Sequence, residues 1–185
     1  MIHPWHDLPA GTHPPEEINV VVEIPQGSRN KYEIDKRTGM FKLDRVLYSA
    51  VHYPGDYGLL PRTLSEDADP LDVLVLVKEP TFAGCIVQCR PLGLLRMRDG
   101  GDLDEKIIAV ATRDPLRADL FDIADLPGHM LREIEHFFQV YKDLEGGRIE
   151  IVGWEQSVAA FAEINASIHR YNLAFPDAAA REAHV

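Results

Sequence analysis

The sequence predicts a mainly β domain with helices (α+β), in which short strands form a small barrel. Two observations carry this prediction. Short β-branched or alternating segments recur along most of the chain, separated by Gly, Pro and Asp. Two segments with apolar residues at helical spacing follow them. Since the chain has 185 residues and shows no repeat or linker, it is predicted to form a single domain, residues 1–185.

The strands are predicted from β-branched runs and from alternation. Residues Ile18 to Ile24 form a run of strand formers, and Pro25-Gln26-Gly27-Ser28 supplies a turn after it. From Lys31 to Asp35 charged and apolar residues alternate, so the three charged side chains share one face. Further strands are expected at residues 41–47, 71–77, 86–97, 106–111 and 148–152.

Two helices and two irregular ends complete the expected domain. Residues 127–145 carry apolar side chains at helical spacing, and Gly146-Gly147 supplies a stop. A second amphipathic helix follows Trp154. Residues 1–17, rich in Pro and His, are expected to form an irregular N-terminal arm, and residues 176–185 a frayed tail.

The composition disfavours several classes of protein. A formal net charge of −11 repels phosphate backbones, so no nucleic acid is expected as a partner. No apolar run approaches the roughly 20 residues that span a bilayer, and the N-terminus lacks a secretory signal, so we expect no membrane contact and a cytoplasmic location. Cys85 and Cys89 are expected on one strand about 13 Å apart, which is too far for a mutual disulfide. They are predicted to be small buried hydrophobic residues.

The segment Asp67-Ala68-Asp69-Pro70-Leu71-Asp72 is the most distinctive feature. Three carboxylates at the mouth of an apolar strand repel one another unless a cation neutralises them, and oxygen ligands favour Mg²⁺ or Mn²⁺. An EF-hand loop is disfavoured because Leu71 and Asp72 stand where it needs an oxygen ligand and glycine. Taken alone, the segment leaves open an acidic turn on an acidic protein.

A second acidic cluster and a set of cations and phenols accompany this segment. Asp99 and Asp104 flank Gly100-Gly101 and are candidates to complete a metal cage, the alternative being a solvated hairpin turn. The candidates to contact a phosphate substrate are Lys31, Arg45, Lys106, Lys142, Tyr53, Tyr57 and Tyr141. The alternative is that each Lys or Arg is a surface charge and each Tyr a partly buried core residue.

Taken together these residues resemble the soluble family I inorganic pyrophosphatases. The family signature Asp-Gly-Asp-Pro-hydrophobic-Asp is matched by residues 67–72. Around it stand further motifs at Val22–Pro25, Lys31–Glu33, Asp44-Arg45, Tyr53-Pro54, Tyr57-Gly58, Asp104 with Lys106, and His136 to Lys142. The resemblance covers about Ile18 to Lys142. It implies a five-stranded, OB-like closed barrel with flanking α-helices and a homo-oligomer, in bacterial members usually a homohexamer.

The resemblance also implies an activity and roles for the site residues. The activity is Mg²⁺-dependent hydrolysis of inorganic pyrophosphate to two orthophosphates, by in-line attack of a water or hydroxide that bridges two metal ions. Asp69 would be the general base. Several Mg²⁺ ions, replaceable by Mn²⁺, would be held by Asp67, Asp72, Asp104, Asp99 and Glu33. The catalytic groups gripping the phosphates would be Lys31, Arg45, Tyr57, Lys106, Tyr141 and Lys142. Glu23 and Tyr53 would stand behind the metal ligands, with Glu23 orienting metal-bound water.

Two positions depart from the pattern of the family. Ala68 replaces the usual glycine, which requires ordinary backbone angles at negative φ there. Gly100 follows Asp99 where many members carry a second acid, a change that affects the surroundings of the metals that arrive with substrate.

Two rival functions remain open at this point. One is a metal-dependent phosphatase or nucleotide hydrolase with a similar acidic cage. The other is a non-catalytic OB-fold that binds single-stranded nucleic acid, which would need a basic groove where this chain places acids. No P-loop, zincin or serine-hydrolase motif occurs.

Overall fold

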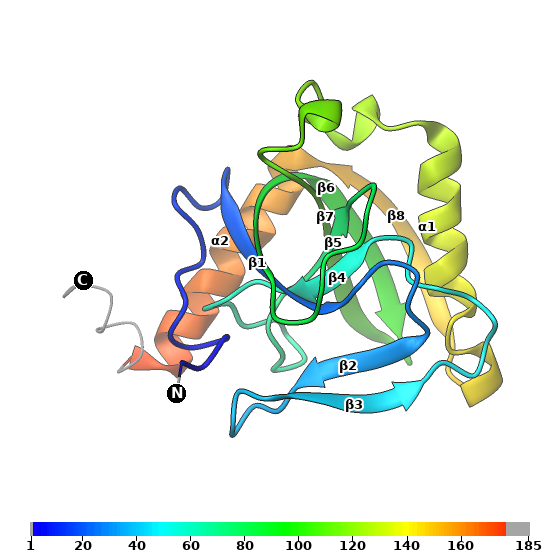
Figure 1. Ribbon diagram of the computed structural model, residues 1–185, viewed down its shortest axis with the longest axis horizontal. Helices are drawn as coiled ribbons and strands as arrows, with labels where there is room; N and C mark the ends of the chain where they lie inside the picture. Colours follow the sequence, from blue (N-terminus) through cyan, green and yellow to red (C-terminus); the bar gives the residue numbers. More distant parts are fainter. Residues whose placement is uncertain (1, 177–185) are drawn as a thin grey trace.

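The computed structural model describes residues 2–176, which form a closed barrel flanked by two helices (Figure 1). The ring consists of β1 (Ile18–Ile24), β4 (Asp56–Leu59), β5 (Asp72–Leu76), β7 (Asp102–Ala111) and β6 (Ile86–Asp99), which pairs back to β1. Only β5 and β7 run parallel; the other four pairings of the ring are antiparallel. The predicted mainly β fold with a five-stranded OB-like barrel is therefore confirmed.

Three further strands lie outside the ring. Strand β8 (Ile149–Gln156) pairs with the part of β6 that extends beyond β1. Strands β2 (Asn30–Ile34) and β3 (Phe41–Val46) form a separate hairpin, which lies along one side of the barrel in Figure 1. This hairpin forms one wall of the site described below.

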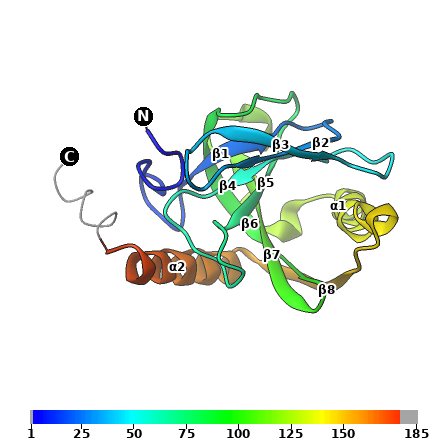
Figure 2. The same ribbon diagram turned by 90° about the horizontal axis from the view of Figure 1, so that it is seen from below.

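The two helices cover different parts of the barrel, as the turned view in Figure 2 shows. Helix α1 (Gly128–Val140) buries Ile134, Phe137 and Phe138 in one apolar cluster with strand residues. Helix α2 (Ser157–Ala174) buries Ala160 and Ile164 in a second cluster. Both helices thus bury an apolar stripe against the barrel. Because this core is closely packed, the ends of the strands are held in fixed positions.

Strand β4 is the element that the sequence reading missed. The segment from Tyr53 to Gly58, which is rich in proline and glycine, is not among the strands that the sequence predicts, yet Asp56–Leu59 is a buried strand between β1 and β5. A Cβ on Gly58 would lie 2.1 Å from the carbonyl oxygen of Val21. Glycine is therefore required here by the close approach of a neighbouring strand and does not mark a turn.

Several predicted boundaries also need correction. The helix predicted over residues 127–145 ends at Val140, and residues 143–145 form a separate 3₁₀ turn that Gly146 closes at φ +77°. The strands predicted at 86–97 and 106–111 are longer and meet in a hairpin, where Asp99 pairs with Asp102. Cys85 precedes β6 and is partly exposed, so only Cys89 is a buried strand residue.

The N-terminal arm contacts both the C-terminal end of α2 and the loop that leads to the acidic segment. Residues 2–17 contain turns and one isolated bridge, His13 to Glu17. Trp5 is buried against Tyr171 and Phe175, and its indole Nε1 donates to the carbonyl oxygen of Thr63 (2.8 Å). Apart from Pro176, the predicted frayed tail lies outside the described residues.

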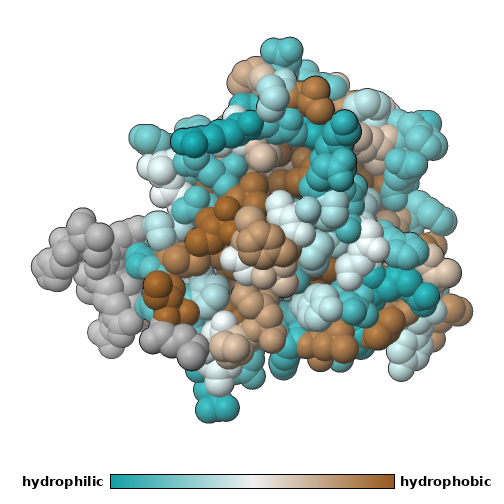
Figure 3. Space-filling view, viewed as in Figure 1, coloured by the Kyte–Doolittle hydropathy of each residue, from teal (hydrophilic) through white to brown (hydrophobic). Residues whose placement is uncertain are grey.

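The face seen in Figure 3 mixes hydrophilic and hydrophobic areas, with hydrophobic residues across much of its middle. No helix within residues 2–176 has both the length and the apolar character needed to cross a membrane.

Candidate active site

A pocket lies between the β2–β3 hairpin and the acidic segment that precedes β5. Seven of the predicted site residues line it: Glu23, Lys31, Glu33, Tyr57, Asp67, Asp69 and Asp72. An adjoining smaller pocket is lined by Asp67 and Asp72 together with Asp104 from β7. The structure thus brings carboxylates from four separate segments to one end of the barrel.

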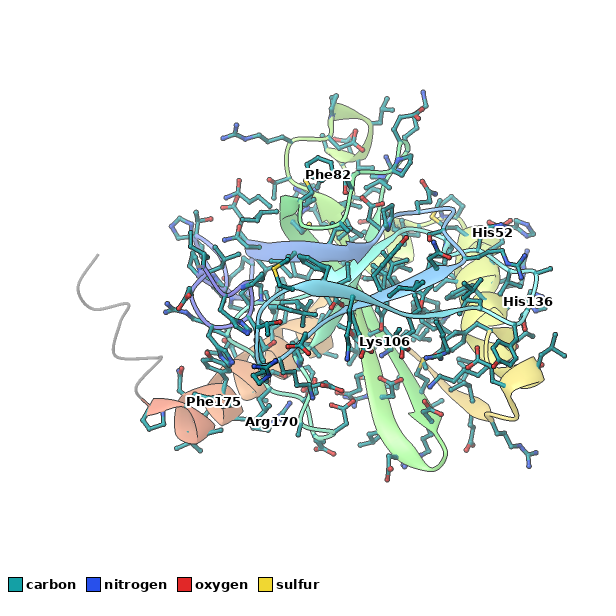
Figure 4. The ribbon with its side chains drawn as sticks, turned by 60° about the horizontal axis from the view of Figure 1, so that its bottom comes forward. His52, Phe82, Lys106, His136, Arg170 and Phe175 are labelled. Carbon is teal, nitrogen blue, oxygen red and sulfur yellow. The ribbon has the colours of Figure 1, made fainter. Side chains whose placement is uncertain are left out.

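Lys106 joins two of these carboxylates. Its ammonium lies 2.5 Å from Asp72 Oδ2 and forms a second ion pair with Asp104, and the side chain is almost fully buried. The parallel register of β5 and β7 places Asp72 directly beside Lys106. Figure 4 shows Lys106 near the middle of the molecule, below the β2–β3 hairpin. Burial alone would lower the pKa of Lys106, but the charges of Asp72 and Asp104 outweigh it and raise that pKa above its ordinary value.

Glu23 is a buried carboxyl group on β1 beside the pocket. Burial, reinforced by the negative charge of Asp72, raises the pKa of Glu23 to about 8. Its Oε1 accepts a hydrogen bond from the backbone N–H of Ile34 (2.7 Å), which ties β1 to the hairpin. Glu23 therefore holds the hairpin wall in place while facing the acids of the pocket.

The hairpin carries two of the predicted cations, and Asp44 links them. Lys31 Nζ lies 3.0 Å from Glu33 Oε2 and 3.2 Å from Asp44 Oδ2, and Arg45 lies 2.5 Å from the same Asp44 oxygen. Arg45 Nε also lies 2.8 Å from Glu145 Oε2. The guanidinium of Arg45 is therefore held between two carboxylates, with its orientation fixed before any substrate arrives.

The predicted tyrosines stack between the barrel and α1. The rings of Tyr53 and Tyr57 are 5.3 Å apart, and Tyr141 packs on Phe137 at 5.4 Å. The Lys106 ammonium lies 5.7 Å from the centre of the Tyr57 ring. Burial raises the pKa of all three phenols, so each is a neutral hydrogen-bond donor at ordinary pH.

Asp99 and Lys142 form an ion pair at the far end of the site. Asp99 ends β6, and Lys142 follows the last residues of α1. Burial of Lys142 acts to lower its pKa, but Tyr141 and Asp99 raise it overall. Neither residue lines the two pockets, and the same holds for Arg45, Tyr53, Lys106 and Tyr141. The structure therefore places these six predicted residues around the pockets and not in their linings.

The backbone at Ala68 contradicts the expectation of negative φ. Ala68 has φ +65°, in the left-handed region that favours glycine. The tight turn before Pro70 imposes this conformation, because Ser65 N donates to Asp69 O (2.7 Å) and Ala68 N donates to Ser65 O (3.2 Å). The alanine is therefore strained where a glycine would not be.

Ala68→Gly is accordingly expected to stabilise the protein by about 1 kcal/mol, because the strain at positive φ is removed. Urea denaturation of the metal-free protein measures the change. As a control, Ala83→Gly alters an exposed loop alanine without positive φ and should not stabilise. Equal effects of the two substitutions would show that the conformation of Ala68 carries no strain.

The donor atoms fit a hard divalent cation. The predicted ligands offer carboxylate oxygens only, which suits Mg²⁺. Burial raises the pKa of Asp67, and the charges of Asp69 and Asp72 add to this, a repulsion that a cation would relieve. Within residues 2–176 no three His, Cys, Asp or Glu side chains converge as a ready metal site; ammonium groups contact Asp72, Asp99, Asp104 and Glu33 instead.

Three residues that contact the site have no role predicted from the sequence. Lys36 forms an ion pair with Asp69, Asp44 joins Lys31 to Arg45, and Glu145 holds Arg45 from the other side. Asp44 and Glu145 each stand within three residues of a predicted site residue, Arg45 or Lys142. Lys36 directly follows Asp35, the last charged residue of the alternating segment, and falls outside the alternation, so no local pattern marks it as a site residue.

The structure is a five-stranded OB-like barrel, and carboxylates alternate with cations at one of its ends, where Lys106 is buried. This arrangement is that of an enzyme suited to a small polyanion. The family model described as inorganic pyrophosphatase matches residues 20–172. The chain belongs to the inorganic pyrophosphatase family, and the prediction that it is an inorganic diphosphatase, a hydrolase, is confirmed.

Individual relatives support this assignment. The inorganic pyrophosphatase of Halalkalibacterium halodurans is 52% identical over 157 residues, which are 85% of this chain and 96% of that protein. Soluble inorganic pyrophosphatase 1 of Arabidopsis thaliana is 48% identical over 169 residues, 91% of this chain and 80% of that one. The crystal structure of the Thermus thermophilus inorganic pyrophosphatase superimposes with a TM-score of 0.88 at 45% identity, covering 91% and 99% of the two chains.

Proposed function

We propose that this chain hydrolyses inorganic pyrophosphate to two orthophosphates in a Mg²⁺-dependent reaction, with Asp69 as general base. The observation that carries the proposal is the buried ammonium of Lys106 between Asp72 and Asp104, next to the pocket that Asp69 lines. A site of alternating fixed charges suits a substrate that is itself a small polyanion accompanied by cations.

Asp67, Asp72 and Asp104 would hold the activating Mg²⁺, with Asp99 and Glu33 available to further ions. When bound, Mg²⁺ supplies a Lewis acid that lowers the pKa of water and offsets the charge of the diphosphate. Mn²⁺ has the same oxygen preference and would substitute. Glu23, which lines the pocket with Asp67 and Asp72, would orient metal-bound water, and the buried Tyr53 would stand behind the metal ligands.

The remaining residues act on the substrate and on the proton. Asp69 is half exposed at the pocket and carries a carboxylate that can accept the proton of the attacking water. Lys31, Arg45, Lys106 and Lys142 would contact phosphate oxygens as charges, and Tyr57 and Tyr141 as neutral donors. Because most of these groups already have partners in the protein, their positions are set before the substrate binds.

An assay of phosphate release tests this proposal. With Mg²⁺ the protein should release phosphate from pyrophosphate, and excess chelator should abolish the release. ATP and a simple phosphomonoester should be poor substrates with Mg²⁺ and better ones with Mn²⁺. Turnover of ATP or the monoester that equals pyrophosphate turnover with Mg²⁺ would instead favour the rival reading, a less selective phosphatase.

The homohexamer and the cytoplasmic location stay predictions. Light scattering on the purified chain measures the number of subunits. A monomer at micromolar concentration would contradict the predicted homo-oligomer.

A further inference from the structure

Lys36 is a positively charged residue of the pocket, and the proposed function gives it no role. It stands in the turn between β2 and β3, outside both strands, and lines the same pocket as Asp69. Its ammonium forms an ion pair with Asp69 Oδ1 and donates to the carbonyl oxygen of Ala68 (3.3 Å). Lys36 therefore reaches across the pocket from the hairpin wall to the acidic segment.

The backbone of Lys36 is held from two sides. Asp35 Oδ1 accepts hydrogen bonds from the backbone N–H of Arg37 (3.2 Å) and of Thr38 (2.8 Å), which closes the turn locally. From the N-terminal arm, His3 Nε2 donates to the carbonyl oxygen of Lys36 (3.1 Å). The turn that carries Lys36 is thus anchored to the body of the protein.

The side chain of Asp69 has few other restraints. It is about half exposed, at 50%, and Pro70 follows it in the loop. Within residues 2–176, no hydrogen bond or ion pair engages its second oxygen, Oδ2. Lys36 consequently fixes one carboxylate oxygen and leaves the other available to a water proton.

We propose that Lys36 is a positioning residue for Asp69: its ammonium holds Oδ1 so that Oδ2 faces the water that Asp69 deprotonates. This inference rests on the proposed function and adds a residue to it. An exposed ion pair adds little stability, so stability is not what Lys36 contributes. The contribution is orientation, where a displacement of about 1 Å can cost as much as 10²-fold in rate.

Two neighbouring substitutions separate this role from a general loss of charge. Lys36→Ala should lower kcat for pyrophosphate about 10- to 100-fold, with KM changed less than about twofold. Arg37→Ala removes one positive charge from the same turn without an ion pair to Asp69, and should leave kcat near the wild-type value. Lys36→Arg keeps a cation within reach and should recover much of kcat.

A double-mutant cycle tests whether Lys36 acts through Asp69. In an Asp69→Asn background, Lys36→Ala should cause no further loss, because the carboxylate that it orients is gone. Mg²⁺ binding measured by calorimetry should shift by the same small factor in Lys36→Ala and Arg37→Ala. Thermal unfolding should be near wild type in both.

Other outcomes would overturn the inference. A rise in KM that persists in the Asp69→Asn background would make Lys36 a substrate contact. Wild-type kcat in Lys36→Ala would make the ion pair a surface contact without function, while the activity of the wild type would leave the proposed function intact. A wild-type protein that releases no phosphate from pyrophosphate in the same assay would remove both proposals.

Discussion

Asp69→Asn is expected to lower kcat for pyrophosphate by about 10³-fold, since a positioned general base typically contributes 10²–10⁴. The amide has the same shape as the carboxylate but cannot accept the proton of water at neutral pH. The hydrogen bond from Asp69 N to Asp67 Oδ1 (3.0 Å) involves the backbone and remains, so the turn should persist. Affinity for Mg²⁺ should change little.

Two further substitutions make this result specific. Asp102→Asn causes the same chemical change in an exposed residue of the β6–β7 hairpin and should leave kcat unchanged. Asp67→Asn, at a proposed metal ligand, should instead raise the Mg²⁺ concentration needed for half-maximal activity. Near-wild-type turnover in Asp69→Asn would assign the general base to another group, whereas a raised Mg²⁺ requirement there would make Asp69 a ligand.

The acids of the site were accessible from the sequence because they cluster. Asp67, Asp69 and Asp72 lie within six residues of one another before an apolar strand, a pattern with an evident electrostatic cost. Residues far apart in sequence were assembled only through the family resemblance. The pairing of Asp72 with Lys106 depends on the parallel register of β5 and β7, which no local pattern encodes.

The structural features that could not be predicted from the sequence all depend on tertiary contacts or on the closure of a turn. The sequence predicts no strand at Gly58, yet this glycine is needed because β1 approaches the backbone of β4. Ala68 looked compatible with negative φ, but the turn closed by Ser65 and Asp69 forces it to +65°. Lys36 has no predicted role in the sequence, and only the fold places Asp69 opposite it. In each case the contact that determines the conformation or the role of the residue is made with another segment or by the closure of a turn.

Lys106→Met is the second substitution with a large expected effect. Methionine keeps roughly the length of the side chain but leaves the carboxylates of Asp72 and Asp104 without their shared counter-charge. Loss of one partner from a buried ion pair costs about 3–5 kcal/mol, so urea denaturation of the metal-free variant should show a loss of that order. Loss of a fixed charge near the substrate should also lower kcat/KM by about 10²–10³-fold.

The effects of Mg²⁺ and pH on the Lys106→Met variant distinguish its loss of stability from its loss of kcat/KM. A bound Mg²⁺ replaces part of the missing positive charge, so saturating Mg²⁺ should stabilise the variant more than the wild type. It should not restore kcat/KM, because the contact with the phosphates remains absent. The pKa of Lys106 is raised above its ordinary 10.5. Its charge is therefore complete throughout pH 6–9 and would be lost only above that range, so the titration of Lys106 itself should add no pH dependence to the stability difference there.

Lys78→Met provides the matched control, since Lys78 is exposed beyond the end of β5 and the same substitution there should change neither stability nor kcat/KM appreciably. If Lys106→Met matched this control in both measurements, the buried ammonium would be needed for neither stability nor catalysis. If instead stability fell but kcat/KM did not, Lys106 would stabilise the fold without contacting the substrate. Only the joint loss, with stability but not turnover recovered by Mg²⁺, fits a cation that holds the acids apart from one another and also contacts the diphosphate.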